Sequence, residues 1–156
     1  MTRVIDENGS VQEIVIEAVT PPVTAINSGT LTTGQALTTA DTTTFGQLTI
    51  ADAEAGQQYL VTCSGELTIN ALDVTDEVDI QLVQSQNDAG FVAIDSAFLA
   101  YGPATPVPYI DSLCCQGLLT IGVSGTLVIR AQGIVSATAT ASIGAGVLSA
   151  VRLDIL

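Results

Sequence analysis

Apolar and polar residues alternate with a period of two over much of this chain. In one segment Val78, Ile80 and Leu82 alternate with acidic and amide side chains. This pattern predicts a strand with one buried face and one face in water. We predict short strands at residues 45–50, 57–63, 66–72, 77–84, 91–100, 113–121, 126–132, 134–143 and 147–155. Eight or nine such strands, with no segment of helical period between them, predict an all-β fold, an antiparallel β-sandwich.

Glycine, asparagine and proline mark the connections between these strands, because they supply the backbone angles that tight turns require. The predicted turns and loops are Ala55–Gly56, Ser64–Gly65, Asn87–Gly90, Gly102–Tyr109, Ser124–Gly125 and Gly144–Gly146.

The first 44 residues differ from the rest in composition. Val11–Ala18 is a short apolar segment with strand character, and residues 28–44 are rich in threonine and poor in large apolar side chains. Such a composition is typical of an extended arm or linker. We therefore predict an N-terminal arm with a short strand at 1–44 and a sandwich domain at 45–156.

Two uncharged stretches, residues 112–129 and 131–151, are as long as membrane-spanning helices. Within the second stretch, however, hydroxyl and small apolar residues alternate from 134 to 143. A helix would spread these hydroxyls around its circumference, whereas a strand places them on one face. We expect a strand there and no membrane insertion.

The last predicted strand, residues 147–155, is apolar on both faces. Such a strand lies in the centre of a sheet and is covered on both sides, by its own fold or by another subunit.

Charge excludes several classes of function. The chain has three basic residues, all arginine, sixteen acidic residues, no histidine and a net charge of −13. Without lysine or histidine there is no Walker-A lysine, no Schiff base and no serine–histidine or cysteine–histidine pair. The negative charge repels nucleic acid. We expect a protein that is not an enzyme, has no cofactor and does not bind nucleic acid.

The C-terminal third carries few charges. Between Ser112 and Leu156 the charged residues are Arg130, Arg152 and Asp154, far fewer than the surface of a soluble monomer usually carries. This stretch is either the interior of the sandwich or is hidden by identical neighbours, and the hydroxyl row favours neighbours. We therefore expect a closed homo-oligomer. The candidate subunit-interface residues are Ser136, Thr138, Thr140, Leu148, Ala150 and Arg152.

Cys63, Cys114 and Cys115 are odd in number and have no metal-binding spacing. The N-terminal residues lack the apolar stretch of a secretory signal, so we expect synthesis in a reducing cytoplasm. The cysteines are then buried small hydrophobic residues. A disulfide from Cys63 to one of the other two is the alternative.

Asp73, Asp76, Glu77 and Asp79 form a dense carboxylate cluster. The favoured interpretation is a solvated acidic turn, and the alternative is a Ca²⁺ site, although the spacing does not fit an EF-hand. A glycosidase that uses paired carboxylates would be the remaining enzyme class, but the chain has no tryptophan and few tyrosines to line a sugar cleft.

Three segments together resemble a known family. A glycine precedes a tyrosine-containing strand in Ala53–Ile69, an acidic region follows at 73–90, and the chain closes with a glycine-containing turn and a long apolar strand over 124–156. This order is similar to the trimeric jelly-roll modules of the C1q/TNF-like type found in bacteriophage virion proteins. The resemblance implies a homotrimer with the last strand near the threefold interface.

Among such proteins, a short chain with an N-terminal arm is most like a head decoration or cement protein. The resemblance thus implies a non-enzymatic virion protein, made in the host cytoplasm, that binds the major capsid protein on the outer capsid surface. The capsid-contact candidates are Val11, Ile14, Val15 and Ile16. They would anchor an arm that adds a strand to a neighbour, unless Val11–Ala18 is the first strand of its own sandwich. The alternative function is the receptor-binding tip of a tail fibre or spike, with a host cell-surface receptor as partner.

Overall fold

The computed structural model describes residues 2–5, 11–14, 26–71, 76–100, 109–136 and 138–153. The strands are β1 (Thr2–Ile5), β2 (Val11–Ile14), β3 (Ile26–Thr30), β4 (Thr43–Ala53), β5 (Gln58–Ala71), β6 (Glu77–Gln86), β7 (Val92–Ala100), β8 (Tyr109–Thr120), β9 (Gly125–Val135) and β10 (Thr140–Leu153). None of the described residues forms a helix long and apolar enough to cross a membrane.

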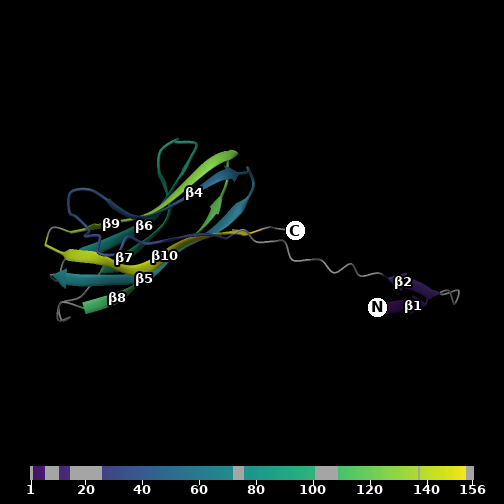
Figure 1. Ribbon diagram of the computed structural model, residues 1–156, viewed down its shortest axis with the longest axis horizontal. Helices are drawn as coiled ribbons and strands as arrows, with labels where there is room; N and C mark the ends of the chain where they lie inside the picture. The colour runs from purple at the N-terminus through teal and green to yellow at the C-terminus, as the bar shows by residue number, and fades with distance from the viewer. Residues whose placement is uncertain are drawn as a thin grey trace.

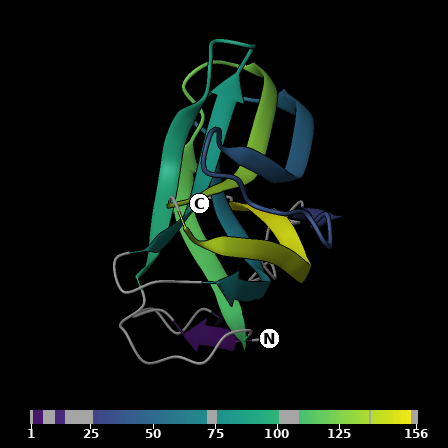
Figure 2. The same ribbon diagram turned by 90° about the vertical axis from the view of Figure 1, so that its left-hand side faces the viewer.

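Eight of these strands form two antiparallel four-stranded sheets, seen as two layers in Figures 1 and 2. We call β3-β10-β5-β8 sheet I and β4-β9-β6-β7 sheet II. From β3 to β10 the chain changes sheet at every connection except the β6–β7 hairpin. This topology is a jelly roll, so the predicted all-β sandwich is confirmed.

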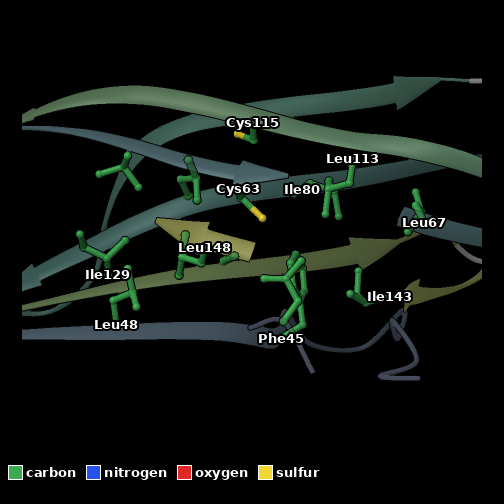
Figure 3. Close-up of a cluster of buried hydrophobic side chains, with 14 of the residues drawn as sticks. Phe45, Leu48, Cys63, Leu67, Ile80, Leu113, Cys115, Ile129, Ile143 and Leu148 are labelled. Atoms are coloured by element: carbon green, nitrogen blue, oxygen red, sulfur yellow. The ribbon is translucent and has the colours of Figure 1, made fainter. Parts of the chain in front are cut away.

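The core lies between the sheets and is mainly aliphatic (Figure 3). Leucine, isoleucine and valine side chains from both sheets meet there, together with Phe45 and Tyr59, the aromatic residues among the buried side chains that the structure describes. β5, β6 and β9 bury alternate residues over most of their length, as in the burial of Val78, Ile80 and Leu82 on β6. The period of two in the sequence therefore reflects the burial of every second side chain between the two sheets.

The last strand is central, as expected. β10 lies between β3 and β5 in sheet I (Figure 1). Its inward residues Leu148 and Ala150 are completely buried in the core, and its other face points away from sheet II.

The sandwich begins earlier than the sequence predicted. We expected residues 28–44 to be a linker, but β3 pairs with β10, and Leu31 and Leu37 are buried in the core. The Leu31 amide donates to the Gly146 carbonyl at 2.9 Å, and the Leu37 amide donates to the Ala141 carbonyl at 2.9 Å. The two buried leucines, together with backbone hydrogen bonds to β4, β9 and β10, hold this threonine-rich segment to the sandwich.

Two predicted turns are also wrong. Ser64–Gly65 lies inside β5, and Gly144–Gly146 is a β-bulge inside β10. The glycines allow close approach instead: a Cβ on Gly65 would lie 2.8 Å from the Ala145 carbonyl oxygen. The predicted strands 57–63 and 66–72 are thus one strand.

The predicted strand at 134–143 does not exist as one strand. β9 ends at Val135, and β10 begins at Thr140. Two hydroxyls of the predicted polar face instead bond a buried carboxylate at this turn, as described below.

β1 and β2 form a separate antiparallel hairpin, with Thr2 opposite Ile14 and Ile5 opposite Val11. The hairpin belongs to neither sheet, and Figure 1 shows it apart from the sandwich.

Candidate functional site

The outer face of sheet I carries a continuous apolar row. The strand register places Ile26, Val151, Leu60 and Leu118 side by side on β3, β10, β5 and β8. Ile26 is 67 % exposed and Leu118 is 57 % exposed, while the two residues between them are half-buried. Side chains directly opposite each other on antiparallel strands are in contact range. The four residues therefore form one apolar surface across the whole width of the sheet.

Small hydroxyl and amide residues surround this row. The next row along the sheet consists of Ser28, Ser149, Thr62 and Gln116, and the row beyond it consists of Thr30, Val147, Ser64 and Cys114. On the other side of the apolar row lie Leu153, Gln58 and Thr120. We call these rows together the sheet I outer face.

This face is almost free of charge. The four strands of sheet I contain the charged residues Glu66, Asp111 and Arg152. Asp111 and Arg152 are paired with Leu67 and Tyr59, whose side chains point inward, so both belong to the inward-facing set. Glu66 is the one charged residue that points outward from these strands.

Sheet II differs, because its outer face is a network of hydrogen-bonded polar groups. The Arg130 guanidinium lies 4.0 Å from the centre of the Phe91 ring, and its Nε donates to Gln47 Oε1 at 2.8 Å. Beside them Gln81 donates to Asp79 at 2.7 Å. Polar side chains that bond one another in this way are typical of a surface in water.

The structure places the predicted interface residues in three different environments. Leu148 and Ala150 are 0 % exposed and lie in the core of one chain, so they do not face a second subunit. Ser136 and Thr138 lie in the turn between β9 and β10, next to exposed Thr140. Arg152 is half-buried at the end of β10. None of the six lies in the rows of the sheet I outer face, and Thr140 is exposed at the start of β10, outside those rows.

The acidic cluster contains a buried structural carboxylate. Asp76 is 6 % exposed, and its two oxygens accept hydrogen bonds from the Ser136 hydroxyl (2.9 Å) and the Thr138 hydroxyl. The Glu77 amide donates to the Ser136 hydroxyl at 2.7 Å. The hydrogen bonds of Asp76 therefore hold the turn between β9 and β10 in place, and Asp76 does not belong to a solvated acidic turn. Asp73 lies outside the described residues.

Within the described part of the chain, no group of three or more cysteine and carboxylate side chains is placed to hold a metal ion.

All three cysteines are free thiols. Cys63 and Cys115 point to the inner side of sheet I, and Cys114 points to the outer side. Cys63 and Cys115 are paired across β5 and β8, and both are buried in the core (Figure 3). Burial raises the pKa of Cys63 to about 12. Burial, with a hydrogen bond from the Cys115 thiol to Asp95 at 3.4 Å, raises the pKa of Cys115 to about 12 as well. Cys114 is exposed, contrary to the expectation that all three are buried.

A pocket of about 390 Å³ lies beside the turn between β6 and β7. Two of its lining residues hold the neighbouring loop: Gln86 Oε1 accepts from the amides of Gly122 (3.0 Å) and Val123 (3.1 Å), and Asn87 Oδ1 accepts from the Thr126 amide at 2.9 Å. Val92 and Val123 line the pocket and are 61 % and 62 % exposed. The loop 122–126 is thus clamped to the hairpin next to two exposed valines.

Other predicted sites fall partly outside the described residues. Val11 and Ile14 lie in β2, whereas Val15 and Ile16 are not described. Of the predicted proline-rich loop, residues 102–108 are not described.

Sequence reasoning missed the sheet I outer face, although a signal was present. The signal consists of runs of neighbouring apolar residues, which in a strand point to both faces. These runs are Tyr59-Leu60-Val61, Leu118-Leu119 and Ala150-Val151. Register alone shows that their outward members line up, and register is not visible in the sequence.

Comparison with known proteins gives a likeness in fold. No family model and no curated protein sequence matches the chain. A structure of the infectious bursal disease virus Gx strain has a TM-score of 0.55 and 12 % identity, over 84 % of this chain and 33 % of that one. A mutant VP2 protein of the same virus, in derived particles, has a TM-score of 0.50 and 9 % identity, over 89 % of this chain and 36 % of that one.

A third solved structure is Eiger TNF from S. frugiperda, with a TM-score of 0.48 and 10 % identity, over 84 % of this chain and 94 % of that one. Our chain spans about a third of the length of the two viral chains. At these identities the viral likenesses show a shared fold, the jelly roll, and nothing further.

Proposed function

We propose that this chain is a non-enzymatic structural protein of a virus particle, and in detail a trimeric decoration or cement protein on the outer surface of a bacteriophage capsid. The observation that carries the proposal is the complete jelly roll of two four-stranded sheets. The two viral chains share this fold. A jelly roll hosts many functions, so the finer assignment rests on the chain's own features.

The use of the buried polar groups supports a structural role. Asp76 is a buried carboxylate that accepts hydrogen bonds from two hydroxyls of a turn, and Cys63 and Cys115 are core residues whose high pKa values keep them protonated at neutral pH. A thiol is nucleophilic only as the thiolate. These groups stabilise the fold and are not poised for chemistry.

The N-terminal hairpin supports docking onto a larger partner. A two-stranded hairpin is marginally stable in water when it stands alone, and β1–β2 belongs to neither sheet of the sandwich. Pairing with the edge of a sheet in the major capsid protein would supply the missing hydrogen bonds. Val11 and Ile14, at the two ends of β2, are the described anchoring residues.

A truncation tests this assignment. Because the sandwich begins at Ile26, deletion of residues 1–25 removes the hairpin and leaves β3 in place. We expect the truncated chain to keep the melting temperature of the sandwich and to lose binding to purified capsid shells in a co-sedimentation assay. Binding by the truncated chain equal to that of the full chain would overturn the docking role.

Charge substitutions refine the same test. The double variant Val11→Asp with Ile14→Asp should bind shells more weakly than Gln12→Asp, which adds an acidic group to the same strand at a position that is already polar. Equal binding by both variants would argue against the two apolar anchors.

The pocket beside the β6–β7 turn favours a second candidate, the receptor-binding tip of a tail fibre or spike. Exposed Val92 and Val123, together with the side chains of Gln86 and Asn87, give this pocket the mix of apolar and polar groups of a ligand site. Pull-down with host cells in parallel with capsid shells separates the candidates. Binding to cells that Val123→Asp abolishes, without binding to shells, would favour the receptor role.

A further inference from the structure

We propose that Arg130, on the outer face of sheet II, is a docking site for a carboxylate on the surface of the protein partner that this chain binds. The inference rests on the proposed function, since it names a contact with that partner in addition to the N-terminal hairpin. Phe91 and Gln47 hold the Arg130 side chain in place, and its terminal nitrogens have no partner in the described part of the chain.

The strand register places Arg130 in the middle of sheet II. It lies on β9, opposite Gln47 on β4 and opposite Val83 on β6. Its neighbours Ile129 and Ala131 are completely buried in the core, so Arg130 points to the outer face. β9 is an interior strand of this sheet. A partner that reaches Arg130 therefore meets the centre of the face, where the residues that dominate binding usually lie.

Two contacts fix the guanidinium of Arg130. Its central carbon lies 4.0 Å from the centre of the Phe91 ring, and its Nε donates to Gln47 Oε1 at 2.8 Å. The N–H donors on Nη1 and Nη2 form no hydrogen bond or ion pair within the residues that the structure describes. A long side chain that is already held loses less freedom when a partner binds. The guanidinium is thus pre-organised to donate to an acceptor outside the chain.

An arginine without an acidic partner stands out in this chain, because its sixteen acidic residues far outnumber its three arginines. Asp79 lies on the same face, but it is opposite Ile134, four residues along β9 from Arg130 and roughly 13 Å away. Its carboxylate accepts from Gln81 at 2.7 Å instead. The other polar groups of this face bond one another, whereas Arg130 keeps donors for a partner.

The charge of the chain favours a carboxylate over a phosphate. A guanidinium can hold either group with two parallel hydrogen bonds. A phosphate monoester carries about −1.5 to −2 charges at pH 7, so a chain with a net charge of −13 repels it more strongly than a carboxylate with a single charge.

The shape of the site favours a protein surface over a small molecule. Arg130 and Phe91 do not line the pocket beside the β6–β7 turn, and Phe91 is 43 % exposed. They lie on an open sheet face, where a small carboxylate would be covered on one side alone. Arginine and aromatic side chains are enriched at the centres of protein interfaces. The partner is therefore a protein with an aspartate or glutamate opposite Arg130.

The same charges determine which protein surfaces fit. The net charge of −13 attracts a neutral or basic surface more than an acidic one. A basic surface is repelled by Arg130 unless a carboxylate faces it, so this residue rejects surfaces without a correctly placed acid. Arg130 thus contributes specificity to a contact that the rest of the chain makes favourable through its negative charge.

Removal of the guanidinium tests the inference. Arg130→Gln in the full chain should weaken binding to capsid shells by about tenfold or more in the co-sedimentation assay. Thr33→Glu is the matched control, because it lies in an exposed turn. One substitution removes a positive charge and the other adds a negative charge, so both change the net charge from −13 to −14. The control should bind like the wild type.

Two further variants separate geometry from charge. Arg130→Lys keeps the positive charge but lacks the planar fork, so it should bind nearly as weakly as Arg130→Gln. Gln47→Ala, at an exposed position, removes the acceptor that holds Nε and should weaken binding by a smaller factor. It also keeps the test valid if changes at Arg130 lower the melting temperature.

Blocking the partner's carboxylates identifies the acceptor. Shells treated with a carbodiimide and ethanolamine carry neutral amides in place of exposed carboxylates. On these shells the wild type and Arg130→Gln should bind equally. A difference that survives the treatment would mean that the acceptor is not a carboxylate and would overturn the proposal.

The outcomes separate this inference from the proposed function. If Arg130→Gln and Gln47→Ala melt normally and bind shells like the wild type, this inference fails and the proposed function stands. If the wild type binds neither shells nor host cells, the proposed function fails, and the inference fails with it. A change in mass on light scattering of Arg130→Gln alone would assign the carboxylate to another copy of the chain and would also overturn the proposal.

Discussion

At the scale of single residues, the polar groups inside this protein mostly hold the backbone in place. Asp76 accepts hydrogen bonds from the hydroxyls of Ser136 and Thr138, which ties the start of β6 to the turn between β9 and β10. In the sequence the same residues looked like parts of an acidic turn and of a polar strand face. The sequence could not show that the carboxylate and the two hydroxyls form hydrogen bonds with each other, because these residues are far apart in the chain.

We predict that the double variant Ser136→Ala with Thr138→Val lowers the free energy of unfolding by roughly 1–3 kcal/mol, because it removes two donors from a buried carboxylate. Denaturant unfolding measures the change. Thr140→Val, at an exposed position outside this cluster, should change stability far less. Equal stability of the double variant and wild type would contradict the structural role of Asp76.

The buried thiols predict a loss of stability at alkaline pH. Burial raises the pKa of Cys63 and Cys115 from the ordinary thiol value of 9.0 to about 12. Above pH 9.0 the unfolded chain releases thiol protons that the folded chain keeps, so unfolding becomes more favourable as pH rises towards 12. The Cys63→Ala, Cys115→Ala double variant should show a shallower decline in melting temperature, and Cys114→Ala should decline like the wild type.

At the scale of strands, the sequence predicted those elements that can be recognised from their own residues. The alternation at Val78, Ile80 and Leu82 located β6, and the turn at Asn87–Gly90 is present, with positive φ angles at Asn87 and Asp88. The prediction failed where an element depends on a distant partner. β3 is held by β10 at the other end of the chain, and Gly65 faces the bulge of β10. A glycine needed for close packing looks like a turn glycine when its neighbour is not known.

We predict that Gly146→Ala destabilises the sandwich by roughly 1–3 kcal/mol, the usual cost of overpacking. Its Cβ would lie 2.5 Å from the Ser64 carbonyl oxygen and 2.6 Å from a methyl carbon of Leu31. Gly122→Ala is the control, since the nearest atom to its Cβ is the Gln86 side-chain oxygen at 3.7 Å. Thermal melting of the two variants should therefore separate them; matching melting temperatures would mean that β10 can shift to accept the methyl group.

At the scale of the whole molecule, the low charge of the C-terminal third has two causes. β9 and β10 are interior strands of their sheets, each flanked by two others, so many of their residues have no contact with water. The second cause is the outer face of sheet I, where the exposed residues of β8 and β10 in the defined rows carry no charge. The sequence could predict that some surface carries little charge, but not which one, because that depends on the register of four strands.

The proposed homotrimer of such an acidic chain predicts an unusual response to salt. The Debye length falls from about 30 Å at 0.01 M to about 3 Å at 1 M ionic strength, which screens the repulsion between chains of charge −13. The dissociation constant from sedimentation should therefore fall as sodium chloride is raised. Dissociation at high salt would instead indicate an assembly held by ion pairs.

The pairing of β3 with β10 also fixes where the chain enters and leaves the sandwich. Ile26, the first residue of β3, is opposite Val151, two residues before β10 ends at Leu153. A fluorescent protein or antigen joined directly before Ile26 or after Leu153 would thus be tethered at the same corner of the sandwich. A cargo that must stay clear of this corner should accordingly be placed in an internal connection at the other end of the strands, away from the hydrogen bonds of Asp76.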